Sequence, residues 1–123
     1  MKILVVDDDA ALLRALRRRL RALPGWEVTF AAGGAAALIA IDEIELDVVL
    51  TDLNMPAIDG ARVIAAARQR SASTICVVMT SAVVNEDELG ADAVFDKPAD
   101  IGEMARWIDQ AYAKTTSKEA KRP

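Results

Sequence analysis

The chain has no histidine, a single cysteine and few aromatic residues: two Trp, one Tyr and two Phe among 123 residues. Without histidine it cannot carry Ser-His-Asp or Cys-His catalysis, a phosphohistidine, or most kinds of zinc site. The lone Cys76 excludes an internal disulfide, and its place in an apolar run favours a buried, inert thiol. Acidic side chains are left to carry any chemistry.

Long apolar runs are also missing. The longest, residues 31–41, is mostly Ala and Gly and falls short of the roughly 18 apolar residues of a membrane span. The apolar start reaches three aspartates by residue 9, unlike a signal peptide, so we expect a cytoplasmic protein without a membrane partner. The net charge of −4 argues against nucleic-acid binding by the surface as a whole.

What is present is a regular alternation of short apolar runs and longer stretches of helical spacing. Three of the runs of three or more residues are apolar at every position, which indicates strands covered on both faces, as in a parallel sheet between helix layers. This order predicts an α/β fold with an open, doubly wound sheet, in one domain over residues 1–113. Residues 114–123 are polar and basic, and we expect a flexible tail there. The runs are Ile3–Val6, Val28–Phe30, Val48–Leu50, Ile75–Met79 and Val94–Phe95.

Polar residues follow four of these runs at the point where each strand would end. Asp7 and Asp8 follow the first run and Asp52 the third, while Thr80 ends the fourth and Lys97 comes just after the fifth. In such a sheet, ligands bind beyond the carboxyl ends of the strands. Three carboxylates brought together there repel each other unless a hard divalent cation, Mg²⁺ or Mn²⁺, lies among them.

The same group of residues suggests phosphoryl chemistry. A carboxylate at a strand end can attack a phosphoryl group and become an aspartyl phosphate. The metal, the ammonium of Lys97 and the hydroxyl of Thr80 can stabilise the negative charge of the transferring group. Each residue alone is unremarkable, since an Asp after a strand often only caps a helix, but their joint placement favours a site.

The motifs around these residues resemble those of response-regulator receiver domains over about residues 1–113. Each motif alone is moderately specific, whereas their order and spacing together are strongly typical of the family. They are Ile3–Asp9, Asp47–Pro56 with Asp59-Gly60, Val78–Ala82, Gly90–Asp92 and Asp96–Pro98.

The resemblance implies a flavodoxin-like sheet of five parallel strands in the order 2-1-3-4-5. It implies that Asp52 is the phosphoacceptor, that Asp8 and Asp52 ligate Mg²⁺ directly, that Asp7 does so through water, and that Asn54 offers its backbone carbonyl. Thr80 would supply a hydroxyl that moves toward the phosphoryl group, Lys97 would pair with that group, and the Lys97-Pro98 peptide would be cis. The donor would be the phosphohistidine of a sensor histidine kinase or phosphotransfer protein, or a small phosphodonor. The only turnover implied is self-phosphorylation and autodephosphorylation at Asp52, with an unknown downstream protein as the target.

Two departures from the family pattern affect how phosphorylation would be communicated to a partner protein. The position three residues before Lys97, where receivers commonly have a switch Tyr or Phe, is Val94, and we expect Phe95 to fill the core instead. Few residues separate Thr80 from Gly90, so we expect a short or absent fourth helix. In the family this helix, the fifth strand and the fifth helix form the usual homodimer or partner surface. We therefore expect an unusual partner or a different face, with a homodimer still among the candidates.

Two rival readings are weaker. A haloacid-dehalogenase-type phosphatase needs a second Asp where this chain has Asn54. A receiver-like interaction module that is never phosphorylated would not need the intact set of Asp7, Asp8, Asp52, Thr80 and Lys97. Trp107 either covers the core edge or anchors an interface. Five arginines between residues 14 and 21 form either a solvated face or a docking surface for an acidic kinase domain. We expect no direct nucleic-acid contact, because no helix-turn-helix is evident.

Overall fold

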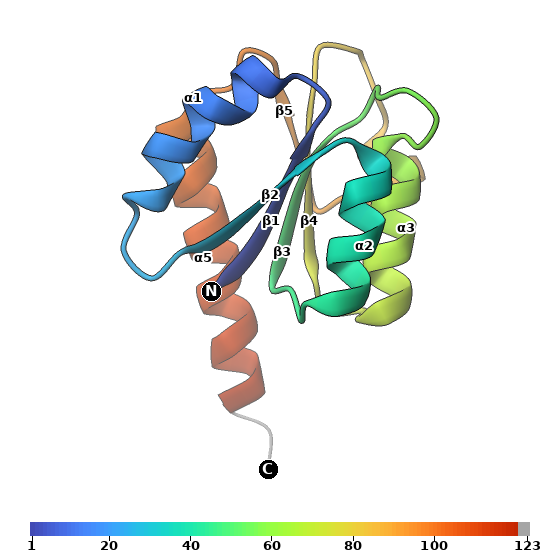
Figure 1. Cartoon of the computed structure of the whole chain (residues 1–123). Helices are drawn as coiled ribbons and strands as arrows, with labels where there is room; N and C mark the ends of the chain where they lie inside the picture. The colour runs from blue at the N-terminus through green and yellow to red at the C-terminus, as the bar shows by residue number, and fades with distance from the viewer. Residues whose placement is uncertain (121–123) are drawn as a thin grey trace.

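Five strands alternate with five helices in the computed structural model, which describes residues 1–120 (Figure 1). The strands are β1 (Lys2–Asp7), β2 (Glu27–Ala32), β3 (Val48–Asp52), β4 (Ile75–Thr80) and β5 (Ala93–Asp96). The helices are α1 (Ala10–Arg21), α2 (Gly34–Glu43), α3 (Gly60–Arg70), α4 (Glu86–Leu89) and α5 (Ile101–Ala120).

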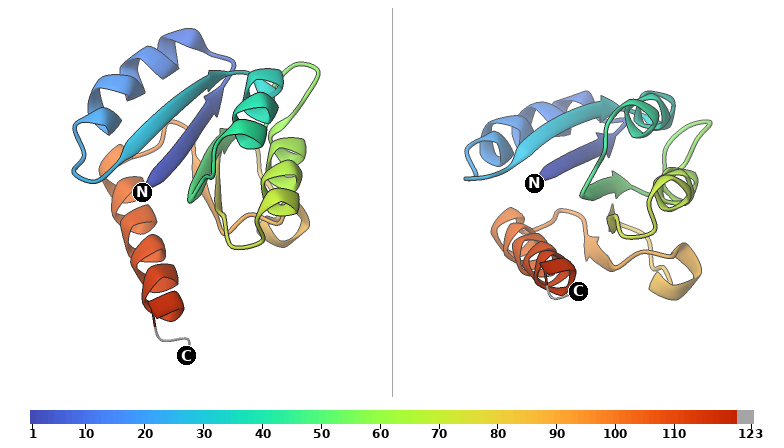
Figure 2. Two further views of the ribbon diagram at one scale, coloured as in Figure 1. Left: turned by 60° about the horizontal axis from the view of Figure 1, so that its bottom comes forward. Right: turned by 90° about the horizontal axis from the view of Figure 1, so that it is seen from below.

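The strands form one parallel sheet in the order β2-β1-β3-β4-β5. The order reverses between β1 and β3, because the chain first adds β2 on one side of β1 and then builds outward on the other side. Helices α1 and α5 cover one face of the sheet, and α2 and α3 cover the other (Figures 1 and 2). The predicted flavodoxin-like, doubly wound architecture is confirmed.

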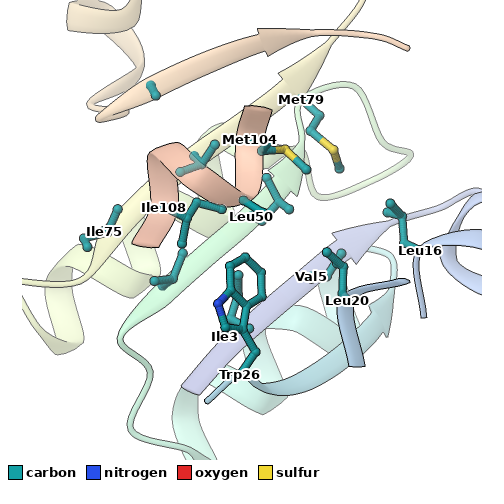
Figure 3. Close-up of a cluster of buried hydrophobic side chains, with 14 of the residues drawn as sticks. Ile3, Val5, Leu16, Leu20, Trp26, Leu50, Ile75, Met79, Met104 and Ile108 are labelled. Carbon is teal, nitrogen blue, oxygen red and sulfur yellow. The ribbon is translucent and has the colours of Figure 1, made fainter. Parts of the chain in front are cut away.

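The core has two layers because successive side chains of each strand point to opposite faces. Ile3, Val5 and Leu50 pack toward α1 and α5, where Leu16, Leu20, Met104 and Ile108 meet them (Figure 3). Leu4, Val6 and Val49 pack toward α2 and α3. Both faces of β3 and β4 are buried, which explains why these runs are apolar at every position.

Side chains that follow the strands also start the helices. The Asp9 carboxylate accepts hydrogen bonds from the amides of Ala11 and Leu12 at the start of α1. Asp100 accepts one from the amide of Glu103 in the first turn of α5.

The indole of Trp26 donates to Asp109 at 2.7 Å, which ties the segment before β2 to α5.

The fourth helix is short, as predicted: α4 has four residues. The fifth helix is longer than predicted, because α5 continues past residue 113 to Ala120. The hydroxyls of Thr115 and Thr116 donate to the carbonyls of Ala111 and Tyr112 along this extension. The predicted tail thus begins within a helix, and its flexibility stays a prediction, since residues 121–123 lie outside the described residues. Within residues 1–120 no helix combines the length and the apolarity that crossing a bilayer requires.

Cys76 lies on the buried face of β4 toward α2 and α3, as its sequence context predicts. Burial raises the pKa of its thiol to about 11. Because the reactive thiolate is then scarce at pH 8, native protein is expected to resist iodoacetamide, whereas denatured protein is alkylated quickly. Mass spectrometry over time checks this; rapid alkylation of native protein would mean that the thiol is accessible.

Candidate functional site

The carboxyl ends of four strands bring the predicted site residues to one rim of the sheet. Asp7 ends β1 and Asp52 ends β3, and both side chains are buried. Thr80 ends β4, and Lys97 follows β5, where its backbone amide donates to the Thr80 carbonyl at 3.0 Å. The Lys97-Pro98 peptide is cis, as the resemblance implied.

Lys97 links two of the carboxylates. Its Nζ lies 2.7 Å from Asp7 Oδ2 and 3.2 Å from Asp52 Oδ2. Burial disfavours the ammonium, but hydrogen bonds to both carboxylates and their negative charges outweigh it, so the pKa of Lys97 is raised. The rim therefore holds a fixed positive charge beside Asp52 at neutral pH.

Three carboxylates meet at this rim. One oxygen each of Asp7, Asp8 and Asp52 can be chosen so that all lie within 4.8 Å of one another. Burial first, and then the charge of Asp7, raise the pKa of Asp52 despite its hydrogen bond to Lys97. The Lys97 ammonium alone does not balance three carboxylates, so the negative charge of ionised Asp52 is only partly compensated.

This donor set fits a hard divalent cation such as Mg²⁺, which prefers oxygen ligands. The Asp8 side chain is exposed, and its carboxylate has no hydrogen bond or ion pair with the side chains or backbone of residues 1–116. Asp7 is different, since its Oδ1 accepts from the Asp9 amide at 2.9 Å and its Oδ2 accepts from Lys97. Asp7 therefore has both carboxylate oxygens engaged within the protein, whereas Asp52 contacts Lys97 through one oxygen.

The other residues that the sequence singled out do not contact the Asp52 carboxylate through a hydrogen bond or ion pair within the described residues. Thr80 is buried, and its hydroxyl oxygen accepts from the Ala82 amide at 3.1 Å. Asn54 is exposed in the loop after β3, and the proposed role of its carbonyl stays a prediction. Phe95 packs toward α5 with its ring edge-to-face against Trp107, whereas Val94 packs toward the opposite face, as strand alternation predicts.

Two glycines, to which the sequence motifs assign no role, shape the loop that joins β3 to α3. A Cβ at Gly60 would overlap the Asp52 carbonyl oxygen and lie 2.9 Å from the Leu53 Cα. Gly60 also donates its amide to the Leu53 carbonyl at 2.8 Å. A Cβ at Gly34, the first residue of α2, would overlap Ile58 of the same loop. The Asp59-Gly60 motif was recognised in the sequence, but only the contacts in the folded protein explain why residue 60 is a glycine.

Replacing Gly60 with alanine is therefore expected to lower the free energy of unfolding by about 1–3 kcal/mol, because the backbone after Asp52 must shift. Urea denaturation measures the change. Gly102→Ala is the matched control, since the nearest atom to a Cβ there is 3.3 Å away and belongs to the exposed Asp100 side chain. Equal stability of the Gly60 variant and wild type would contradict the close packing.

The rim lies apart from a groove at the opposite edge of the sheet. The groove, of about 440 Å³, lies at the amino-terminal ends of β3 and β4, and its lining includes Asp47, Ile75 and Tyr112. It contains none of the rim residues. The acid cluster thus lies at the carboxyl ends of the strands, where an open parallel sheet is expected to bind ligands.

Comparisons with known proteins agree with this geometry. A family model described as response regulator receiver domain matches residues 3–109. Transcriptional regulatory protein PrrA of Mycobacterium tuberculosis is 38% identical over 108 residues, which cover 84% of this chain and 46% of PrrA. The chain thus spans about half the length of such relatives.

Solved structures show the same fold. A receiver domain protein from Methanospirillum hungatei superposes with a TM-score of 0.87 at 24% identity, over 95% of this chain and 97% of its own. A receiver domain of a Francisella response regulator has a TM-score of 0.81 at 26% identity, over 93% of this chain and 98% of its own.

Proposed function

Because the chain belongs to the response regulator receiver domain family, we propose that it receives a phosphoryl group on Asp52 and that phosphorylation changes its binding to a partner. The donor is the phosphohistidine of a sensor histidine kinase or phosphotransfer protein, or a small phosphodonor. An Asp52 oxygen forms a bond to phosphorus while the bond from phosphorus to the donor's imidazole nitrogen breaks, and that nitrogen keeps the electron pair.

The observation that carries this proposal is the surroundings of the Asp52 carboxylate. It ends a buried strand at the open rim, 3.2 Å from the Lys97 ammonium and next to two further acids. A carboxylate held in place is a competent nucleophile. Lys97 remains charged at neutral pH, so it can stabilise the oxygens of the phosphoryl group as the group transfers.

We propose Mg²⁺, with Mn²⁺ as a substitute, as the cofactor. Asp8 and Asp52 would bind it directly, Asp7 through water, and Asn54 through its backbone carbonyl. When bound, the ion neutralises charge on the transferring group. Asp7 meanwhile holds Lys97 in place through their 2.7 Å contact.

Thr80 would couple phosphorylation of Asp52 to a change in the surface that a partner binds. Its hydroxyl can leave the Ala82 amide and donate to a phosphoryl oxygen, which would change the loop before α4. With α4 reduced to four residues, the surface next to β5 differs from the one that family members commonly use. We propose a downstream protein, or a second copy in a homodimer, as the reader of this change, in the cytoplasm where the donors occur.

Incubation with acetyl phosphate and Mg²⁺, followed by intact-mass spectrometry, tests phosphorylation. Wild type is expected to gain the mass of one phosphoryl group and to lose this gain when EDTA is present. Asp52→Asn is expected to gain none. Asp42→Asn, which makes the same change at an exposed residue of α2, is expected to behave as wild type.

The second candidate function is an interaction module that is never phosphorylated. Val94 in place of the usual aromatic residue and the short α4 favour it mildly. Absence of any mass gain with acetyl phosphate, phosphoramidate or a phosphorylated kinase would favour this reading over ours.

A further inference from the structure

Positive and negative charges are separated along this chain and in space. Residues 10–26 contain five arginines and no acid, whereas residues 85–96 contain five acids and no cation. The right-hand view of Figure 2 shows α1, in blue, and the short α4, in yellow-orange, at opposite corners of the molecule. The corner at α1 is therefore cationic and the corner at α4 anionic, and we call them the cationic end and the anionic end of a chain whose net charge is −4.

The cationic end is an ordered row of side chains on α1. Four arginines recur at spacings of three and four residues and share one face, which we call the arginine face. All are exposed, and none forms an ion pair within the described residues. Like charges at this spacing repel, so an anionic partner would relieve an unfavourable interaction. The four are Arg14, Arg17, Arg18 and Arg21.

Part of the arginine face is held in place by Phe30 of β2. The guanidinium carbons of Arg17 and Arg21 lie 5.4 and 5.6 Å from the centre of its ring. Such cation–π contacts limit the freedom of both side chains, so less entropy is lost when they bind an anion.

The anionic end lies on α4 and β5, and we call it the acidic segment, residues 85–96. Glu86, Asp87 and Glu88 form most of α4 and are exposed. Asp92 is already bound, since its Oδ2 lies 2.8 Å from Arg68 and accepts from the Cys76 amide. Together with exposed Asp96, four acids remain without an ion pair among the described residues.

We propose that the arginine face of one copy binds the acidic segment of a second copy. The arginine face and the acidic segment carry opposite charges, and both surfaces are present on every molecule. Because they lie at opposite corners, the contact is head-to-tail rather than two-fold, and each added copy leaves one surface of each kind open. Exposed ion pairs are weak and screened by salt, so the association is weak and depends on ionic strength.

Sedimentation velocity over a range of protein concentrations tests the proposal. In salt of about 0.01 M, where the Debye length is about 30 Å, the average sedimentation coefficient is expected to rise with concentration; in about 1 M salt it should remain that of a monomer. Arg14→Glu/Arg18→Glu and Glu86→Lys/Glu88→Lys are each expected to weaken self-association about tenfold or more at low salt. An equimolar mixture of the two variants should associate again, because each then offers the surface that the other lacks.

Arg62→Glu/Arg106→Glu and Asp42→Lys/Glu43→Lys make the same charge changes at other exposed positions and are expected to associate as wild type. Unchanged acetyl phosphate labelling of every variant would show that the fold and the rim are intact. Three results would each overturn the proposal: a monomeric wild type at low salt, association that survives either charge reversal, or a mixture that stays monomeric. None of these results bears on phosphorylation of Asp52.

Discussion

Replacing Lys97 with methionine is expected to lower the free energy of unfolding by about 3 kcal/mol near pH 7 in metal-free protein. The substitution removes the only cation within 4 Å of Asp7 and Asp52 among the described residues and leaves fully buried Asp7 without its partner at 2.7 Å. Urea denaturation in EDTA measures the loss. Lys2→Met, at an exposed position of β1, is the matched control.

The pH dependence of this loss follows from the raised pKa of Lys97. A raised pKa means that the charged lysine stabilises the fold fully below its ordinary value of 10.5 and that this contribution fades as the pH rises through the folded-state pKa. The gap between wild type and Lys97→Met should therefore be constant at pH 7–9 and shrink in more alkaline buffer. A gap below about 0.5 kcal/mol at pH 7 would show that the ion pairs contribute little.

Replacing Asp52 with asparagine is expected to abolish phosphorylation and yet stabilise the metal-free protein at pH 7. The pKa of Asp52 is raised above its ordinary value of 3.8, chiefly by burial, so ionising it costs more in the folded state than in the unfolded state. The cost develops as the pH rises from about 3.8 through the folded-state pKa, and it is fully present above that pKa. Asparagine has a similar shape and avoids this cost.

Thermal denaturation at pH 7 and pH 4 in EDTA measures the second effect. The Asp52→Asn variant should melt several degrees above wild type at pH 7, and this difference should shrink at pH 4, close to the ordinary carboxyl pKa of 3.8. Saturating Mg²⁺ should narrow the gap at pH 7, because only wild type keeps the full set of acids. A variant less stable than wild type at pH 7 without metal would contradict this electrostatic account.

The strands and the clustering of polar residues at the rim were predictable because each strand and the residue after it form a continuous stretch of sequence. Runs such as Val48–Leu50 are apolar at every position since both faces of β3 are buried, and the polar residue after each run lies at the rim by the geometry of parallel strands. The ten-position spacing between Thr80 and Gly90 likewise left room for only a short α4.

Contacts between distant segments were not predictable. The hydrogen bond from the Trp26 indole to Asp109 joins residues 83 positions apart, and no sequence pattern near either residue predicts it. The close approach of Gly60 to the Asp52 carbonyl depends on the path of the loop. The extension of α5 was not predicted because residues 114–120 lack the apolar spacing that marks a packed helix, although they adopt helical backbone.

The most direct test of the central claim is to locate the phosphoryl group chemically. Borohydride reduces an aspartyl phosphate to homoserine, and tandem mass spectrometry identifies the converted residue. After labelling with acetyl phosphate and Mg²⁺, homoserine is predicted at position 52 and at no other aspartate. Homoserine at position 7, 8 or 9 in place of 52, or a labelled protein with no homoserine at all, would contradict the assignment of Asp52 as the acceptor.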